Sequence, residues 1–313
     1  MNIFSIVYFS RLSFNNINSD CDFLEFLQNL EDIVKLYKKS KNIKFEISSD
    51  FLDYSENDIV SLSDLILSLI DNDSIKLGYY LSEIEKIFTS SKSYNNTYGI
   101  KNTIMSWDGN SLCTHYPFII GKEDKWPTLE DVIHTYGYSD TLRLNCDYII
   151  RNHSNSSNFI NLCKLCFDFL IFHEDILTSL QTIQKGSYVN YIETLVHCLN
   201  VLNQAYHLIS TSPNQNQSDL VTIMNLSAQL GKHLQCTRQR KNRIIKIFPF
   251  PLELDKPGGE AVNCEYHLKI NNYDNGQPIE RGTGNPVRIY FALKSYEQLE
   301  RKQIKIAHIG KHL

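Results

Sequence analysis

The spacing of apolar residues changes to two in the last quarter of the chain, and this change constrains the fold more than any other feature. Apolar residues occupy every second position from Val262 to Ile270 and again from Val287 to Leu293, with polar or small residues between most of them. A period of two is that of a β-strand with one apolar and one polar face. Together with a further strand expected at 303–309, the pattern predicts a small antiparallel sheet of three or four strands.

The first fifty residues predict a strand, a helix and a second strand. Residues 3–9 are rich in β-branched and aromatic side chains, and residues 43–47 alternate. Between them, Ser19 can cap a helix whose apolar residues recur at steps of three and four. This order of elements favours parallel pairing of the two strands. Beyond them we expect helices at 58–70 and 74–88, a loop at 89–102 and short strands within 103–120.

The middle of the chain is predicted to be helical. Apolar residues recur with helical spacing in residues 159–182 and 189–210, and Ser218 can cap a third helix that ends near residue 234. The Ser- and Asn-rich residues 151–158 predict a linker. The expected fold is therefore mixed α+β, with three parts: an α/β domain with parallel strands at 1–150, a helical region at 151–236 and a basic antiparallel β module at 237–313.

Composition indicates a globular chain of a reducing compartment. With 313 residues and 42% hydrophobic residues the chain can bury a core, and its 8 cysteines are scattered like free thiols. The apolar runs are shorter than the ~20 residues of a membrane span, and the first residues lack the basic region of a secretory signal. We therefore expect a cytoplasmic protein without a membrane partner. The CxxC pair Cys163 and Cys166 lies in an apolar helix, which favours a structural interpretation over a zinc or redox site.

Positive charge is concentrated in residues 238–313. These residues contain 14 Lys and Arg against 8 Asp and Glu, whereas the preceding 237 residues contain 17 and 27. Such a split indicates either that the basic part binds an anionic partner or that it docks on the acidic part of the same chain. In the first case, the expected nucleic-acid-binding residues are Arg238, Arg240, Lys241, Arg243, Lys305 and Lys311.

The polar faces of the alternating strands carry the candidate catalytic residues. If the two strands pair in register, Glu265, His267 and Lys269 lie close to Arg288 and Tyr290. Arginine and lysine can hold a phosphate, and histidine or tyrosine can transfer protons. Cleavage of RNA by its own 2′-hydroxyl group needs these groups and neither a metal ion nor a cofactor. The predicted catalytic residues are His267, Lys269, Arg288, Tyr290 and His312.

Each of these residues also has a structural interpretation. Glu265 and Lys269 can be solvated charges, and Arg288 can form an ion pair with a nearby glutamate. His308 has two interpretations: it can complete the catalytic set together with His312, or it can face the core, since it shares the parity of the two isoleucines before it in the expected strand.

The last strands resemble those of a toxin family. The run Val287–Phe291 and the later run Ile304–His312 are similar to the C-terminal strands of RelE/ParE-type toxins of bacterial toxin–antitoxin systems, over residues 244–313 at most. In that family, basic and proton-transferring residues of the sheet carry ribosome-associated mRNA cleavage. Arg288 matches the strand arginine of the family, and Lys311 or His312 matches its terminal basic position. The family is usually small, and this chain has over two hundred additional residues.

The resemblance implies a toxin or phage-defence effector. Its target would be RNA or the ribosome, and an inhibitor or a companion defence protein would be a partner. ParE-like members act on DNA gyrase instead, so the fold alone does not fix the activity.

Two other functions stay open. Asp50, Asp53 and Asp108 follow expected strands, where open α/β sheets place ligands, and three carboxylates can hold Mg²⁺ in a PIN-like nuclease. Alternatively, the protein is not an enzyme: its basic sheet binds nucleic acid or a protein, and its acidic body regulates that binding.

Overall fold

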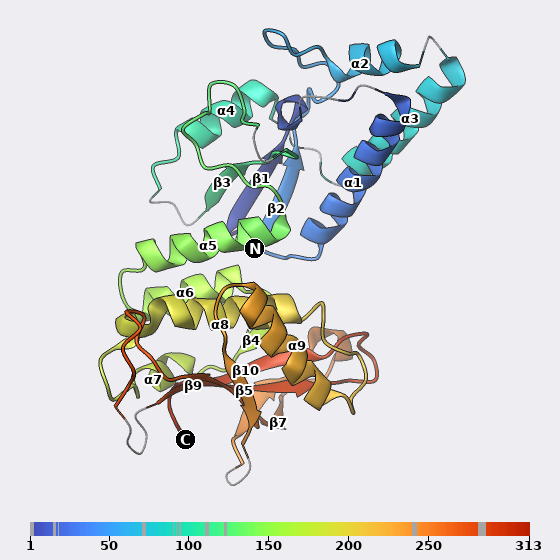
Figure 1. Cartoon of the computed structure of the whole chain (residues 1–313). Coiled ribbons are helices and arrows are strands. Elements are labelled where there is room, and N and C mark those ends of the chain that lie inside the picture. Colours follow the sequence, from blue (N-terminus) through green and yellow to red (C-terminus); the bar gives the residue numbers. More distant parts are fainter. Residues whose placement is uncertain are drawn as a thin grey trace. The chain divides into compact units, whose positions relative to one another are not determined.

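The computed structural model describes most of the chain (Figure 1). The described residues are 3–14, 17, 19–70, 73–89, 91, 93, 95–109, 113–121, 124–239, 243–280 and 286–313. The chain divides into two compact units, residues 1–145 and 146–313. The helices expected at 151–236 and the strands expected at 237–313 therefore belong to one unit.

The first unit contains a parallel three-stranded sheet in the order β2-β1-β3. Its strands are β1 (Ser5–Phe9), β2 (Ile43–Ile47) and β3 (Thr114–Pro117). Its helices are η1 (Arg11–Ser13), α1 (Asp20–Lys38), α2 (Leu62–Leu69), α3 (Ser74–Phe88) and α4 (Thr97–Met105), and α5 (Tyr138–Asn152) continues into the second unit. The parallel pairing of β1 with β2 confirms the prediction from the strand–helix–strand order, and Ser19 caps α1 as expected.

Two local predictions in the first unit were wrong. Residues 97–105 form helix α4 rather than part of a loop, because polar side chains bind the free backbone amides at its start: Asn96 accepts from the amide of Gly99, and Asp50 accepts from that of Thr97. Trp107, expected in a strand, lies outside the strands, and β3 begins only at Thr114.

The second unit is built on a five-stranded sheet in the order β4-β10-β9-β8-β5. Its strands are β4 (Leu170–Phe172), β5 (Gln235–Arg238), β8 (Tyr266–Ile270), β9 (Val287–Lys294) and β10 (Gln303–Lys311), and a separate hairpin consists of β6 (Ile245–Pro249) and β7 (Gly259–Asn263). Its helices are α6 (Ser156–Cys166), α7 (Ile176–Leu180), η2 (Tyr188–Tyr191), α8 (Ile192–Ala205), α9 (Asn216–Gln229) and η3 (Leu252–Leu254). The predicted antiparallel sheet is present, and β4 adds a parallel edge strand next to β10.

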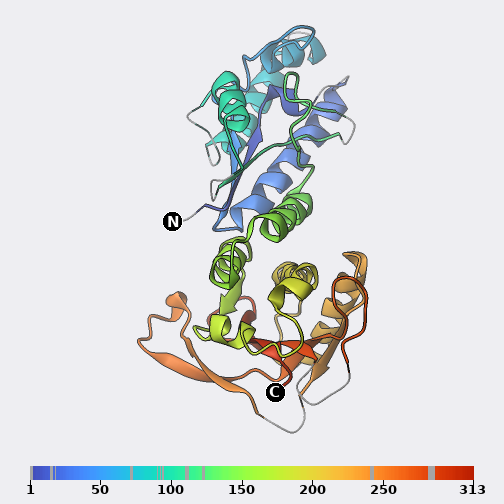
Figure 2. The same ribbon diagram turned by 90° about the vertical axis from the view of Figure 1, so that its left-hand side faces the viewer.

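Two predicted elements of the second unit are broken into pieces. The helix expected at 159–182 ends at Cys166, and the chain then forms strand β4, whose backbone groups pair with β10. The strand expected at 262–270 is two strands: β7 pairs with β6, whereas β8 pairs with β5 and β9. The break at Cys264 and Glu265 lets the hairpin leave the sheet (Figure 2).

The two faces of the five-stranded sheet differ. One face is apolar and buried, with Leu268, Ile289 and Ile306 among its side chains, and helices α8 and α9 lie on this side of the sheet (Figures 1 and 2). On the other face, Phe248 and Val262 of the hairpin pack into one cluster with residues of β9 and β10. This second face carries the polar residues that the sequence singled out.

Candidate functional site

The pairing of β8 with β9 brings the predicted catalytic residues together. His267 lies opposite Tyr290, and Lys269 lies opposite Arg288. Residues opposite each other in neighbouring strands share a face of the sheet. The register expected from the alternating pattern is therefore confirmed, and four of the predicted residues form one cluster.

A β-bulge in β10 adds His308 to this cluster. Ile306 pairs regularly with β9, but the next paired residue is His308, which lies opposite Tyr290, so Ala307 is an additional residue in the strand. The extra residue reverses the parity, so of the two interpretations left open, His308 faces the cluster and not the side of Ile306. His308 is buried all the same, and its Nε2 lies 3.0 Å from the carbonyl oxygen of Lys311.

Tyr290 lies at the centre of three histidines. Its ring centroid is 5.0 Å from that of His267, 5.8 Å from that of His308 and 6.4 Å from that of His312. The rings of His267 and His312 are perpendicular, with centroids 6.1 Å apart. The hydroxyl oxygen of Tyr290 accepts a hydrogen bond from the backbone amide of Leu313, which places His312 beside the cluster.

Only part of this cluster is open to solvent. The exposed fraction is 0% for Tyr290, 4% for His267 and 7% for Arg288, whereas Lys269 and His312 are partly exposed. A ligand at the surface can therefore touch Lys269 and His312 directly. The buried Arg288 can act on such a ligand through its positive charge. The buried Tyr290 and His267 can act on it only through the residues that they contact.

All three histidines have pKa values below the ordinary range. Burial, together with the positive charges of Arg288 and Lys269 and with His312, lowers the pKa of His267 to about 4. Burial lowers the pKa of His308 to about 4, and burial followed by the same two cations lowers the pKa of His312. At neutral pH the rings of His267 and His308 are therefore uncharged.

Arg288 is fixed in place by its neighbours. Its Nη1 donates to the carbonyl oxygens of Val287 at 2.8 Å and Ile270 at 3.3 Å, and to Oδ1 of Asn271 at 3.1 Å. Within the described part of the chain, Nε of Arg288 and Nδ1 of His267 are buried without a hydrogen-bond partner. Such atoms are uncommon in folded proteins, and other described residues, among them Ser48 and Asn203, also carry one.

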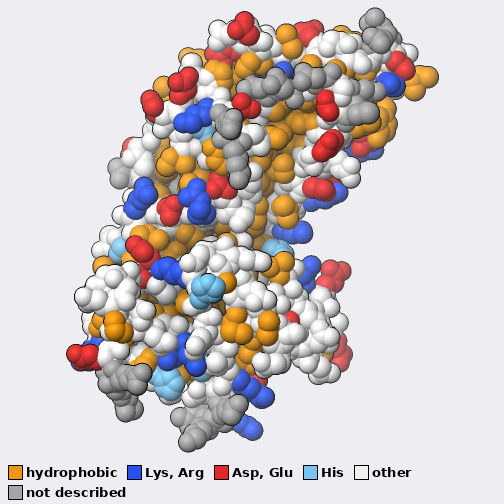
Figure 3. Space-filling model, in the orientation of Figure 1, with side chains coloured by type: hydrophobic (Ala, Val, Ile, Leu, Met, Phe, Trp, Pro, Cys, Tyr) orange, Lys and Arg blue, Asp and Glu red, His pale blue; other side chains and the backbone are white. Residues whose placement is uncertain are grey.

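Of the expected nucleic-acid-binding residues, the structure describes four, which lie in or next to strands β5, β6 and β10. Arg238 and Arg243 are exposed, and Arg238 lies 2.9 Å from the carboxylate of Glu265. Lys311 is partly exposed at the end of β10. The other two residues of the basic run, Arg240 and Lys241, lie outside the described residues. On the face of the second unit drawn in Figure 3, basic side chains lie among uncharged ones rather than in one continuous patch.

Lys305 does not belong to an exposed basic surface, contrary to expectation. Its side chain is completely buried, and Nζ lies 2.9 Å from Glu260 and 3.3 Å from the carbonyl oxygen of Pro249. It also lies over the ring of Phe248. These contacts with Glu260, Pro249 and Phe248 fasten the β6–β7 hairpin to the sheet. The hairpin therefore covers this end of the polar face.

The three aspartates of the alternative nuclease site do not form a metal site. Asp50 accepts hydrogen bonds from the backbone amide and the hydroxyl group of Thr97, and Asp53 and Asp108 are exposed. No group of three or more His, Cys, Asp or Glu side chains in the described ranges could hold a metal ion.

The CxxC pair lies in a buried helix, as the sequence predicted. Cys163 and Cys166 are buried in α6, and burial raises the pKa of both thiols well above the ordinary value. A thiol that stays protonated is a poor nucleophile.

A pocket of about 470 Å³ lies beside Lys269, and sequence reasoning did not find it. Gln235 of β5 and the Asn-rich loop after β8 line it together with Lys232, which comes from the segment after α9. The only sequence signal was the concentration of asparagine in residues 271–275, which was interpreted as an ordinary loop.

No family model, curated protein or solved structure matches this chain. Among the helices that the model describes, none is both long enough and apolar enough to cross a membrane.

Proposed function

We propose that the second unit cleaves RNA through attack of a 2′-hydroxyl group on the neighbouring phosphate. The observation that carries this proposal is the position of His312, a partly exposed imidazole beside His267, on the sheet face where Lys269 lies opposite Arg288. Proton transfer and neutralisation of phosphate charge are the two requirements of this reaction. The cluster contains groups for both.

In the proposed reaction a bond forms between the 2′-oxygen and phosphorus, and the bond from phosphorus to the 5′-oxygen of the next nucleotide breaks. His312 accepts the proton of the 2′-hydroxyl group, and the departing 5′-oxygen takes a proton from the imidazolium thus formed. Lys269 contacts the phosphate oxygens, while the buried charge of Arg288 stabilises the developing negative charge. The products carry a 2′,3′-cyclic phosphate and a 5′-hydroxyl group.

A bound phosphate also makes His312 a better base. The positive charges of Arg288 and Lys269 contribute to the low pKa of His312 in the free protein. A phosphate at Lys269 opposes both charges, so the pKa of His312 rises towards its ordinary value when RNA is bound. A base is most effective when its pKa is close to the working pH.

Tyr290 has a positioning role in this proposal. Because its ring is completely buried and its hydroxyl group binds the amide of Leu313, we assign the proton transfer to His312 and not to Tyr290. His267 has a similar role, since its Nε2 lies 3.0 Å from the hydroxyl oxygen of Thr237.

The biological setting rests on the resemblance to RelE/ParE-type toxins. It supports RNA or the ribosome as the target, a toxin or phage-defence role, and an inhibitor or companion protein as a partner. These parts of the proposal concern the partner and not the chemistry of the cluster.

The test is incubation of the full chain with RNA, DNA and translating ribosomes, with and without a chelator. We expect RNA cleavage that persists with chelator and yields cyclic phosphate ends. His312→Gln and Lys269→Gln should each lower the rate by roughly a hundredfold. The matched controls are His153→Gln, in the loop after α5, and Lys164→Gln, on the exposed side of α6, and both should retain the activity. Full activity in folded His312→Gln would contradict the mechanism.

Binding of RNA without cleavage is the second candidate. The burial of His267, Tyr290 and Arg288 favours it, because buried groups contact a substrate poorly. In that case RNA is retained by the protein with an affinity that falls steeply with salt, and no new ends appear.

A further inference from the structure

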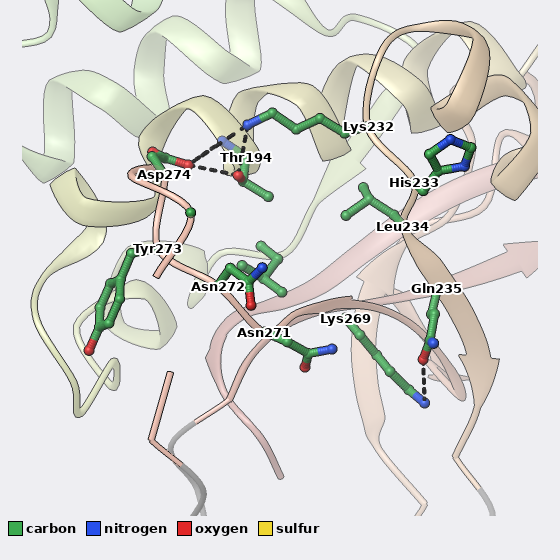
Figure 4. A pocket seen from close by; sticks show the side chains of 12 residues that line it. Thr194, Lys232, His233, Leu234, Gln235, Lys269, Asn271, Asn272, Tyr273 and Asp274 are labelled. Carbon is green, nitrogen blue, oxygen red and sulfur yellow. Dashed lines mark hydrogen bonds and ion pairs between the residues drawn. The ribbon is translucent and has the colours of Figure 1, made fainter. Parts of the chain in front are cut away.

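The pocket beside Lys269 combines cationic, amide and apolar groups. Figure 4 shows Lys232 on one side and Lys269 on the opposite side, with Leu234 and Asn272 between them. The volume of about 470 Å³ lies within the range of pockets that hold small organic ligands. All of its lining residues belong to the second unit.

The charges in the pocket are not equivalent. Asp274 accepts hydrogen bonds from the backbone amides of Glu193 and Thr194 and from the hydroxyl group of Thr194 at the start of α8. Lys232 donates to the same hydroxyl group and lies 3.9 Å from Asp274, so these two charges offset each other. Lys269 makes a long hydrogen bond of 3.5 Å to Gln235. It is therefore the cation best placed to bind an anionic group.

Lys269 also connects the pocket with the sheet cluster. It lines the pocket and at the same time lies opposite Arg288, whose Nη1 donates to Asn271, another pocket residue. A phosphate held at Lys269 thus has the pocket on one side and the histidines on the other. The group next to that phosphate along an RNA strand is a nucleoside.

We propose that this pocket binds the nucleoside adjacent to the phosphate held by Lys269, and so selects the base at which RNA is bound and cleaved. The amide groups of Gln235 and Asn272 offer both donors and acceptors, which the edge of a nucleobase requires, and Leu234 and Ile270 provide an apolar surface for its ring. The inference rests on the proposed function in naming RNA as the substrate.

The first experiment measures binding of AMP, CMP, GMP, UMP and inorganic phosphate to the full chain by calorimetry. We expect one nucleotide to bind roughly tenfold or more tightly than phosphate, which corresponds to one or two net hydrogen bonds. Asn272→Ala should remove that advantage and leave phosphate binding unchanged, whereas Lys269→Gln should weaken both. The matched control Asn214→Ala, in the exposed loop before α9, should bind like the unaltered protein. Equal binding of all four nucleotides and phosphate would overturn the proposal.

The second experiment compares the bases at the cleavage sites of the unaltered protein and Asn272→Ala by sequencing of RNA ends. An altered base preference in Asn272→Ala supports the pocket. If cleavage persists with the same preference, the pocket assignment fails and the cleavage proposal stands. If no RNA is cleaved but one nucleotide binds selectively through Asn272, the pocket assignment stands and the cleavage proposal fails.

Discussion

The hydroxyl oxygen of Tyr290 accepts a hydrogen bond of 3.2 Å from the backbone amide of Leu313. A second bond, between Nε2 of His308 and the carbonyl oxygen of Lys311, fastens the same segment to the sheet. Together they fix the backbone on both sides of His312. The distance between the His312 and His267 rings therefore depends on two residues that do not reach the surface themselves.

Tyr290→Phe tests this dependence, because it keeps the ring and removes the bond to Leu313. We expect about 1 kcal/mol less stability and roughly tenfold slower RNA cleavage, since His312 is held less firmly. The measurements are urea unfolding and the dependence of the cleavage rate on pH. A positioning role leaves the pH profile of the residual activity unchanged, whereas a displaced profile or an undiminished rate would contradict it.

The buried histidines make stability depend on pH in a defined window. A histidine in the unfolded chain has a pKa near ~6.5, whereas His267 and His308 in the folded chain have values of about 4. Between these limits the unfolded chain binds protons that the folded chain does not. The contribution of these two histidines to the free energy of unfolding is therefore fully present above pH ~6.5 and is lost as the pH is lowered towards about 4.

His308→Gln should flatten this dependence. Removing one such histidine makes the slope shallower by up to ~1.4 kcal/mol per pH unit within the window, and urea unfolding at several pH values measures it. His153→Gln is the control for loss of a histidine outside the sheet. Equal slopes for the unaltered protein and His308→Gln would show that burial does not lower the pKa of His308.

The pairing at the centre of the site could be predicted from sequence, because alternation fixes which residues share a face. His267 and Lys269 have the parity that places them beside Arg288 and Tyr290, and the structure confirms that register. The pattern does not determine what covers a face. Lys305 has the same alternation as an exposed residue, yet the hairpin packs over it and Glu260 compensates its charge.

Other features arise from contacts that no local pattern encodes. The bulge at Ala307 places one extra residue in a strand that otherwise alternates, so the side of His308 could not be inferred. Strand β4 lies within a segment of helical periodicity, and its pairing with β10, over 130 residues away, decides its conformation. The pocket is lined by side chains from separate segments, among them β5, β8 and loops. None of these segments carries a sequence pattern that indicates a pocket.

Gly310→Ala should destabilise the second unit. A Cβ atom at Gly310 would overlap the carbonyl oxygen of Ser179 and Oγ1 of Thr182, where the end of α7 lies against β10. Because this contact involves backbone, the strand must shift, at a cost of about 1–3 kcal/mol. The matched control is Gly78→Ala in α3, where a Cβ meets no atom and helix propensity favours alanine. Urea unfolding measures both, and an unchanged stability of Gly310→Ala would show that β10 and α7 separate without cost.

Asp50→Asn distinguishes the two nuclease hypotheses. The carboxylate of Asp50 accepts bonds from the amide and the hydroxyl group of Thr97 at the start of α4, so its substitution should lower the stability of the first unit by about 1–3 kcal/mol. If the sheet cluster of the second unit carries the chemistry, RNA cleavage per folded molecule stays the same, with or without chelator. Urea unfolding and cleavage rates at a temperature where the variant is folded provide the comparison. Loss of cleavage in folded Asp50→Asn, together with sensitivity to chelator, would instead assign the activity to the aspartates of the first unit, because a carboxylate that only caps a helix contributes to folding and not to the rate.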